Sequence, residues 1–178
     1  ISLYDAISEG VGEQVTALTS IEDLKKIATK LGMKIDPKWV NGKLAEEIFE
    51  HVAQDKLIEP TFVMGYPVDT SPLVRAHREL PGVAEKWDLY IDGFELATGY
   101  SELVDPVIQR ERLIEQAQLG AKGDLEAMQV DEDFLRAMEF GMPPMGGMGM
   151  GVDRLLMALT GLGIRETILF PLVKPEAD

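Results

Sequence analysis

The chain has 178 residues, of which 46% are hydrophobic, and a net charge of −14 from 17 basic and 31 acidic residues. This length suits one domain with a buried core, and the acidic balance argues against a general nucleic-acid-binding surface. The chain has no cysteine, which excludes disulfides, thiol nucleophiles and cysteine-bound metals and indicates the cytosol. No apolar run approaches the roughly 20 residues of a membrane span. The first residue, Ile1, indicates a piece of a longer protein.

The pattern of residues 1–58 predicts three helices, and we find no candidate catalytic or binding residues in this segment. The first covers about residues 2–11, where apolar side chains recur near a period of 3.6. Ser20 is a typical N-cap for the second helix, which ends before Gly32, and the third helix starts near Asn41. We interpret this segment as a helical layer or insertion.

Residues 59–178 predict strands, turns and further helices. A β-like run at 61–64 precedes a loop rich in proline and glycine, and strands at 87–91 and 94–103 meet at an Asp-Gly turn. The pattern predicts a single α+β domain, an antiparallel sheet flanked by helices. The later expected elements are a helix from Pro106 to Gly120 or Gly123, a helix capped by Asp131, a glycine-rich strand, a helix from Val152 to Gly161, and a closing strand from Thr167 to Phe170.

Acidic residues gather on the predicted hairpin. Side chains two residues apart share one face of a strand, so Thr98, Tyr100 and Glu102 lie together unless a bulge intervenes. Asp88 and Glu95, on opposite strands, are candidates to share a Mg²⁺ ion, which prefers oxygen ligands and nucleotide phosphates. Like charges this dense need a cation partner. A solvated polar face is the alternative, and spacing alone favours it because acidic strands are common.

Glycines alternate at 147, 149 and 151, so one face of the predicted strand carries no side chains. Such glycines often mark the close approach of a ligand. The run is not a dinucleotide fingerprint, because Val152 stands where a third glycine is needed, and it is not a phosphate loop. Arg154 falls in the first turn of the next helix, where a cation can pair with phosphate. A tightly packed bend with a structural ion pair is the alternative.

The remaining candidates favour ordinary structural roles. His51 and His77 are far apart and form no metal signature, so we expect both at the surface. The run at 110–112 is interpreted as a solvated helix face. The methionines around the glycine run are interpreted as packing groups: Met142, Met145, Met148 and Met150.

Taken together, residues 59–174 resemble the C-terminal part of the catalytic domain of class II aminoacyl-tRNA synthetases, the lysyl-tRNA synthetases in particular. Several long motifs occur in the family's order. They are Pro60-Thr-Phe-Val, Ser71-Pro-Leu-Val, Trp87-Asp-Leu-Tyr, Phe94-Glu-Leu-Ala-Thr-Gly-Tyr-Ser-Glu-Leu, Asp105-Pro-Val-Ile-Gln-Arg-Glu-Arg, Gly141-Met-Pro-Pro, Gly149-Met-Gly-Val-Asp-Arg and Ile164-Arg-Glu-Thr-Ile-Leu-Phe-Pro.

The resemblance implies an ATP-dependent lysine–tRNA ligase, a cytoplasmic homodimer. The lysine carboxylate would attack the α-phosphate of ATP to give lysyl adenylate, and the lysyl group would then pass to tRNA(Lys). Arg154 would be the catalytic arginine that holds ATP. The implied contacts are Glu95, Gly149, Gly151, Val152, Asp153 and Arg154 for ATP, Thr98, Tyr100 and Glu102 for lysine, and Asp88 with Glu95 for Mg²⁺.

Three departures from the family pattern stand out. Asp88 replaces the usual glutamate, and Thr98 replaces the usual asparagine. The family's motif 2 carries an Arg-x-Glu, and this chain contains none, so the chain is expected to be the part downstream of motif 2 and inactive alone. Two alternatives stay open: the synthetase-like domain of a lysyl-phosphatidylglycerol synthase, and a non-catalytic truncated paralogue.

Overall fold

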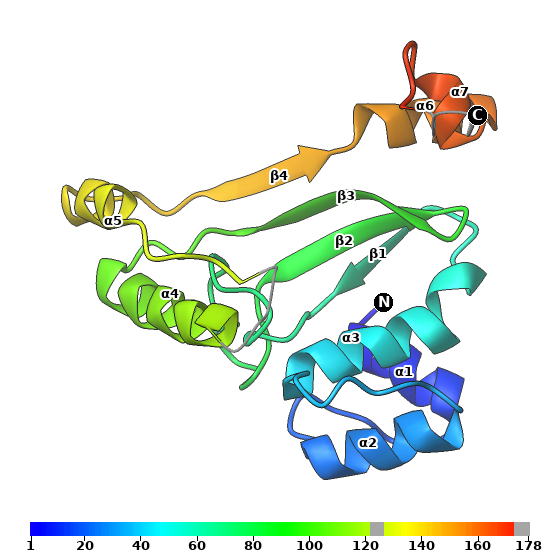
Figure 1. Ribbon diagram of the computed structural model, residues 1–178, viewed down its shortest axis with the longest axis horizontal. Coiled ribbons are helices and arrows are strands. Elements are labelled where there is room, and N and C mark those ends of the chain that lie inside the picture. Colours follow the sequence, from blue (N-terminus) through cyan, green and yellow to red (C-terminus); the bar gives the residue numbers. More distant parts are fainter. Residues whose placement is uncertain (122–126, 173–178) are drawn as a thin grey trace, which may run out of the picture.

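The computed structural model describes residues 1–121 and 127–172. Three helices gather beneath one side of a four-stranded sheet, and the chain leaves the far edge of the sheet into two final helices (Figure 1). Every strand pair is antiparallel, in the order β1-β2-β3-β4, which confirms the predicted α+β class. The elements are α1 (Leu3–Val11), α2 (Ile21–Lys30), α3 (Asn41–Val52), the 3-10 helix η1 (Gln54–Lys56), β1 (Thr61–Met64), β2 (Lys86–Ile91), β3 (Phe94–Ser101), α4 (Pro106–Ala121), α5 (Glu132–Glu139), β4 (Gly146–Met150), α6 (Val152–Thr160) and α7 (Ile164–Thr167).

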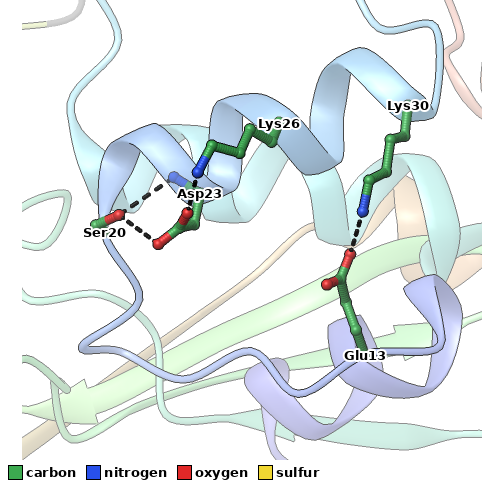
Figure 2. A network of polar contacts seen from close by, with 5 residues as sticks. All are labelled: Glu13, Ser20, Asp23, Lys26 and Lys30. Carbon is green, nitrogen blue, oxygen red and sulfur yellow. Dashed lines mark hydrogen bonds and ion pairs between the residues drawn. The ribbon is translucent and has the colours of Figure 1, made fainter.

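Local capping fixes the start of α2. The Ser20 hydroxyl accepts the backbone N–H of Asp23 at 3.2 Å and donates to the Asp23 carboxylate at 2.7 Å. Lys26 pairs with the same carboxylate, and Lys30 reaches Glu13 in the loop after α1 at 3.0 Å (Figure 2). The N-cap prediction for Ser20 is therefore confirmed, because the cap satisfies a backbone donor that the helix leaves unpaired.

The main hydrophobic core joins the helices to the sheet. The ring of Phe49 on α3 meets the ring of Tyr90 on β2 edge to face, with centroids 5.7 Å apart. The helices therefore cover the sheet face that carries Tyr90. Fully buried side chains of this core include Leu3, Ile7, Leu24, Leu44, Ile48 and Val63.

A bulge in the hairpin decides which side chains share a face. Leu89 pairs with Ala97, whereas Tyr90 pairs with Glu95, so Leu96 is the extra residue on β3. The bulge brings Glu95 to the face of Tyr90, which strict alternation from Thr98 or Tyr100 would not do. The helix-facing side of the hairpin therefore carries Lys86, Asp88, Tyr90, Glu95, Thr98 and Tyr100.

A smaller core lies between α4 and α5, where Leu113, Leu135 and Met138 are buried. The predicted solvated face at 110–112 is right for Arg110, which makes an exposed ion pair with Glu132. It is wrong for Arg112.

The Arg112 guanidinium is half-buried and donates to the carbonyls of Ser71 and Val74. Gln109, also on α4, donates to the carbonyl of Pro72 at 3.0 Å. These contacts tie the loop at 71–74 to α4.

The end of the chain corrects the sequence analysis. The predicted strand at 167–170 is not present. Residues 164–167 form α7 instead, whose first turn is closed by Glu166 accepting the N–H of Gly163 at 2.8 Å. Gly161 ends α6 with a φ of 71°, as predicted. Gly123, one proposed end for α4, lies outside the described residues.

Candidate active site on the helix-facing side of the hairpin

The predicted metal carboxylates lie on one sheet face. Asp88 pairs across the strands with Thr98, and Glu95 pairs with Tyr90, the next residue along that face. Burial and the nearby charge of Asp88 both raise the pKa of Glu95, so the two carboxyls are electrostatic neighbours. The bulge at Leu96 is therefore what brings this pair together.

Asp88 is almost completely buried, with 2% of its surface exposed. Its Oδ2 atom lies 3.0 Å from the Nζ atom of Lys86. Its Oδ1 atom has no hydrogen-bond partner within 3.5 Å, and the Tyr66 hydroxyl faces the same carboxylate, whose charge helps burial to raise the pKa of Tyr66. The buried Oγ1 atom of Thr98 across the strand has no partner either. Unpaired buried polar atoms are costly and rare in proteins. Two of them side by side indicate a place where a polar ligand supplies the missing partner.

The described residues hold no cluster of three or more potential His, Asp or Glu metal ligands. Asp88 and Glu95 would need other oxygens, such as those of a nucleotide phosphate, to complete a Mg²⁺ shell. The unpaired Oδ1 atom and the half-buried Glu95 carboxylate suit that role, although Lys86 already holds the other oxygen of Asp88. The residues present fit the metal.

Glu102 and Tyr100 lie farther along the same face. A Cβ atom on Gly147 would stand 2.6 Å from Oε1 of Glu102, so the carboxylate occupies the space that this glycine leaves open. Burial and the charge of Glu102 raise the pKa of Tyr100, which places the phenol near the carboxylate. A carboxylate beside an aromatic ring suits an ammonium group.

The alternating glycines of β4 serve different purposes. Gly147 makes room for Glu102, whereas a Cβ atom on Gly149 would find only Thr98, at 4.0 Å. Gly151 donates its N–H to the carbonyl of Leu96 and begins α6. The open space above Gly149 lies opposite Thr98, next to the unpaired oxygens, and agrees with the prediction of close approach by a ligand.

Arg154 closes the opposite end of the site. It lies in the first turn of α6, donates to the carbonyl of Glu95, and keeps a guanidinium nitrogen 3.9 Å from the Glu95 carboxylate. Its side chain stays half-exposed, so donors remain for a phosphate. Val152 and Asp153 are exposed beside it.

A cavity of about 1330 Å³ opens beside the Tyr100 end of the site. It runs from α1 and the loop after it to the start of β2 and to the β3–β4 pair. Tyr100, Gly147 and Lys86 line it, together with Tyr4 of α1. The cavity therefore brings the helical segment next to predicted site residues.

Sequence reasoning missed Lys86, Tyr66 and Glu46. Lys86 could have been predicted from the sequence, because it stands two residues before Asp88 and therefore lies on the same strand face. Tyr66 and Glu46 could not. The segment after β1 brings Tyr66 to Lys86, and the packing of α3 brings Glu46 there. His77 accepts two backbone N–H groups in its own loop. His51 lies on the exposed side of α3, so both histidines have the ordinary places that we predicted.

Comparisons with known proteins show the family of this chain. The family of class II tRNA synthetases (D, K and N) matches residues 3–174. A lysine–tRNA ligase of Kineococcus radiotolerans is 67% identical over 177 residues, which are 99% of this chain and 35% of that protein. A lysine–tRNA ligase of Mycobacterium bovis BCG is 54% identical and covers all of this chain and 36% of that protein.

A third relative has a different name. The lysylphosphatidylglycerol biosynthesis bifunctional protein LysX of Mycobacterium avium is 54% identical over 98% of this chain, which is 15% of that protein. This chain thus spans about a third of the length of the lysine–tRNA ligases that it matches, and less of LysX. Among the described residues, no helix is both long and apolar enough to cross a bilayer.

Proposed function

The chain belongs to the family of class II tRNA synthetases (D, K and N), and we propose that it is the C-terminal catalytic part of a lysine–tRNA ligase. The observation that carries the proposal is the pair of unpaired buried oxygens, Oδ1 of Asp88 and Oγ1 of Thr98, on the same sheet face as Glu95 and Glu102. Identities of 54–67% to lysine–tRNA ligases support the choice of lysine.

Each site residue has a task in the proposed reaction, in which the lysine carboxylate attacks the α-phosphate of ATP and pyrophosphate leaves. Glu102, beside Tyr100, would bind the side-chain ammonium of lysine. Arg154 would hold ATP through charge-assisted hydrogen bonds. Catalysis would rest on positioning and on charge stabilisation, without a covalent enzyme intermediate.

Asp88 and Glu95 would hold Mg²⁺ together with the ATP phosphates. When bound, the ion supplies charge neutralisation at the phosphate oxygens. The chain's own contribution is to hold the two carboxylates on one sheet face, with Asp88 buried and Glu95 half-buried. The backbone of Gly149, Gly151, Val152 and Asp153 would line the nucleotide, since these residues lie between the open space over β4 and Arg154.

The rest of the proposal concerns the whole protein. Transfer of the lysyl group to tRNA(Lys), a homodimer and a cytoplasmic location follow from the resemblance to lysine–tRNA ligases. The absence of cysteine from the sequence supports the last point.

A second candidate function rests on one observation, the similarity of nearly the whole chain to LysX. In that case the same lysine-activating site would serve lysylphosphatidylglycerol synthesis. The sequence upstream of the matched region distinguishes the two, because transmembrane helices there would favour the second.

The test is lysine-dependent ATP–pyrophosphate exchange by this chain and by the longest product of its gene, measured side by side. We expect exchange in the longer product alone, because this chain has no Arg-x-Glu. Glu102→Gln in that product should reduce exchange at limiting lysine by at least about a hundredfold. Glu59→Gln, at an exposed position before β1, is the matched control.

Each contrary outcome removes a definite part of the proposal. Exchange by this chain itself would show that another group replaces the missing arginine. No exchange by either protein would favour a non-catalytic paralogue. An unchanged rate for Glu102→Gln would contradict the assignment of lysine.

A further inference from the structure

We propose that Lys86 is a positioning residue for Asp88: it holds Oδ2 of the carboxylate, so that Oδ1 alone is presented to the ligand beside Thr98. This inference rests on the proposed function, since the ligand in question is the metal–nucleotide complex. Lys86 itself touches neither substrate nor metal in this scheme and acts through Asp88.

The strand geometry makes this contact direct. Lys86 and Asp88 alternate along β2 and point to the same face. The Lys86 Nζ atom lies 3.0 Å from Oδ2 of Asp88, and the two side chains are 22% and 3% exposed. The contact is an ion pair, and the low exposure of both side chains strengthens the attraction between the two charges. The ammonium therefore holds Oδ2 and leaves Oδ1 on the other side of the carboxylate.

Lys86 is in turn held by its own surroundings. Its Nζ atom lies 4.1 Å from the centroid of the Tyr66 ring, within the range of a cation–π contact. The Tyr66 hydroxyl lies 3.4 Å from that of buried Tyr90. The carbonyl of Lys86 also accepts the N–H of Gly65 at 3.1 Å. Both the backbone and the head group of this lysine are therefore restrained, as a positioning residue requires.

The unpaired oxygen distinguishes positioning from simple charge balance. A purely structural ion pair would leave both carboxylate oxygens with partners, because an unmatched buried oxygen costs stability. Here Oδ1 of Asp88 has none, and its cross-strand neighbour Thr98 also has a free buried hydroxyl oxygen. Lys86 thus satisfies one oxygen and leaves the other available next to a second vacant acceptor.

The experiment uses the longest product of the gene and compares Lys86→Met with wild type. Mn²⁺ serves as the probe, titrated by electron paramagnetic resonance in the presence of a non-hydrolysable ATP analogue. Residues that orient metal ligands typically change metal affinity by 10–100-fold, so we expect Mn²⁺ binding to weaken at least about tenfold. The Mg²⁺ concentration for half-maximal exchange should rise by a similar factor, while the KM for lysine stays within about twofold.

Three further variants separate positioning from folding. Lys86→Arg should restore Mn²⁺ binding to within about threefold of wild type, because it keeps the charge and the donor. Lys43→Met is the matched control, since Lys43 is also half-buried and 3.0 Å from its partner Glu47, and it should leave Mn²⁺ binding unchanged. The double variant Lys86→Met with Asp88→Asn should bind Mn²⁺ no more weakly than Asp88→Asn alone.

Several results would overturn the inference. Unchanged Mn²⁺ binding in Lys86→Met would leave this lysine a purely structural role, and tighter binding would make it a competitor of the metal. Additive losses in the double variant would show that it does not act through Asp88. If Lys86→Met fails to fold, Lys86→Gln takes its place in each comparison. Wild-type protein without lysine-dependent exchange would contradict the proposed function instead, and the Mn²⁺ titration would still test Lys86.

Discussion

The helical segment α1–α3 and the β4–α7 segment both carry helix caps and periodic apolar patterns, but their surroundings are very different. Leu44 and Ile48 on α3 are completely buried, whereas Val152 and Leu159 on α6 are 70% and 74% exposed. Within the described residues, α1–α3 find partners for their apolar stripes and α6 does not. A cap and a periodic apolar pattern therefore suffice to specify a helix, but they do not determine what covers it.

The candidate site lies across the boundary between these two regions. Asp88 is buried on the inner strand β2, while Arg154 and the glycines of β4 lie at the exposed edge of the same sheet. The proposed metal ligand Asp88 is thus buried, whereas Arg154, proposed to hold the nucleotide, is half-exposed. This contrast agrees with a chain that spans about a third of its lysine–tRNA ligase relatives.

The largest expected effect compares the two regions directly. Phe49→Ala removes a ring that is 1% exposed and should lower the free energy of unfolding of this chain by about 3–5 kcal/mol. Leu159→Ala, on the exposed side of α6, should change it by less than about 0.5 kcal/mol. Urea unfolding curves measure both. An equal loss for the two variants would show that α6 is covered in solution.

The next effect concerns pH. Burial raises the pKa of Glu46 to about 7, against the opposite influence of Thr70, Lys86 and Lys43. A carboxyl whose pKa is higher in the folded state stabilises the protein when protonated, so stability should fall as the pH rises from about 4.5 to 7.

The full effect of Glu46 is on the order of 3 kcal/mol, since one unit corresponds to about 1.4 kcal/mol. Glu46→Gln should remove most of this decline, measured by urea unfolding at pH 5 and pH 8. Glu59→Gln is the exposed control. An equally steep decline in Glu46→Gln would assign the pH dependence to Glu50 and Glu95, whose pKa values are also raised by burial.

A smaller effect compares two glycines of β4. Gly147→Ala would bring a methyl group 2.6 Å from Oε1 of Glu102, so the carboxylate must move. In the longest product of the gene, we expect the KM for lysine to rise about tenfold, equivalent to about 1.4 kcal/mol. Gly149→Ala, which meets only Thr98 at 4.0 Å, should leave the KM for lysine unchanged and raise that for ATP. The reverse pattern would exchange the two assignments.

The smallest effect tests the cap within the helical segment. Ser20→Ala removes the hydroxyl that accepts the N–H of Asp23 (Figure 2) and should cost about 1 kcal/mol in urea unfolding. Lys30→Ala breaks the exposed pair with Glu13 and should cost less than about 0.5 kcal/mol. A larger loss for Lys30→Ala would show that this surface pair anchors α2 more strongly than its cap.

Some of the site followed from residue types and spacing. Two-residue alternation along the strand after the Asp-Gly turn placed Thr98, Tyr100 and Glu102 on one face. The position of Arg154 in the first turn of α6 also followed from sequence. Their roles came from the resemblance to a family.

The prediction of a closing strand at 167–170 was wrong. The Glu166 carboxylate accepts the N–H of Gly163, and this contact starts a helical turn that apolar periodicity did not reveal. The exposure of Met148 and Met150 also differed from the expected packing.

By itself, the sequence determined the type and the approximate bounds of most helices and strands, because caps, glycines and alternation act within a few residues of one another. Tertiary structure decided which face each side chain occupies and what it meets there. The bulge at Leu96 moved Glu95 to the face of Asp88, the packing of α3 brought Glu46 to Lys86, and the segment after β1 brought Tyr66 there. These outcomes depend on contacts between residues far apart in the chain, whose burial and charge no local pattern encodes.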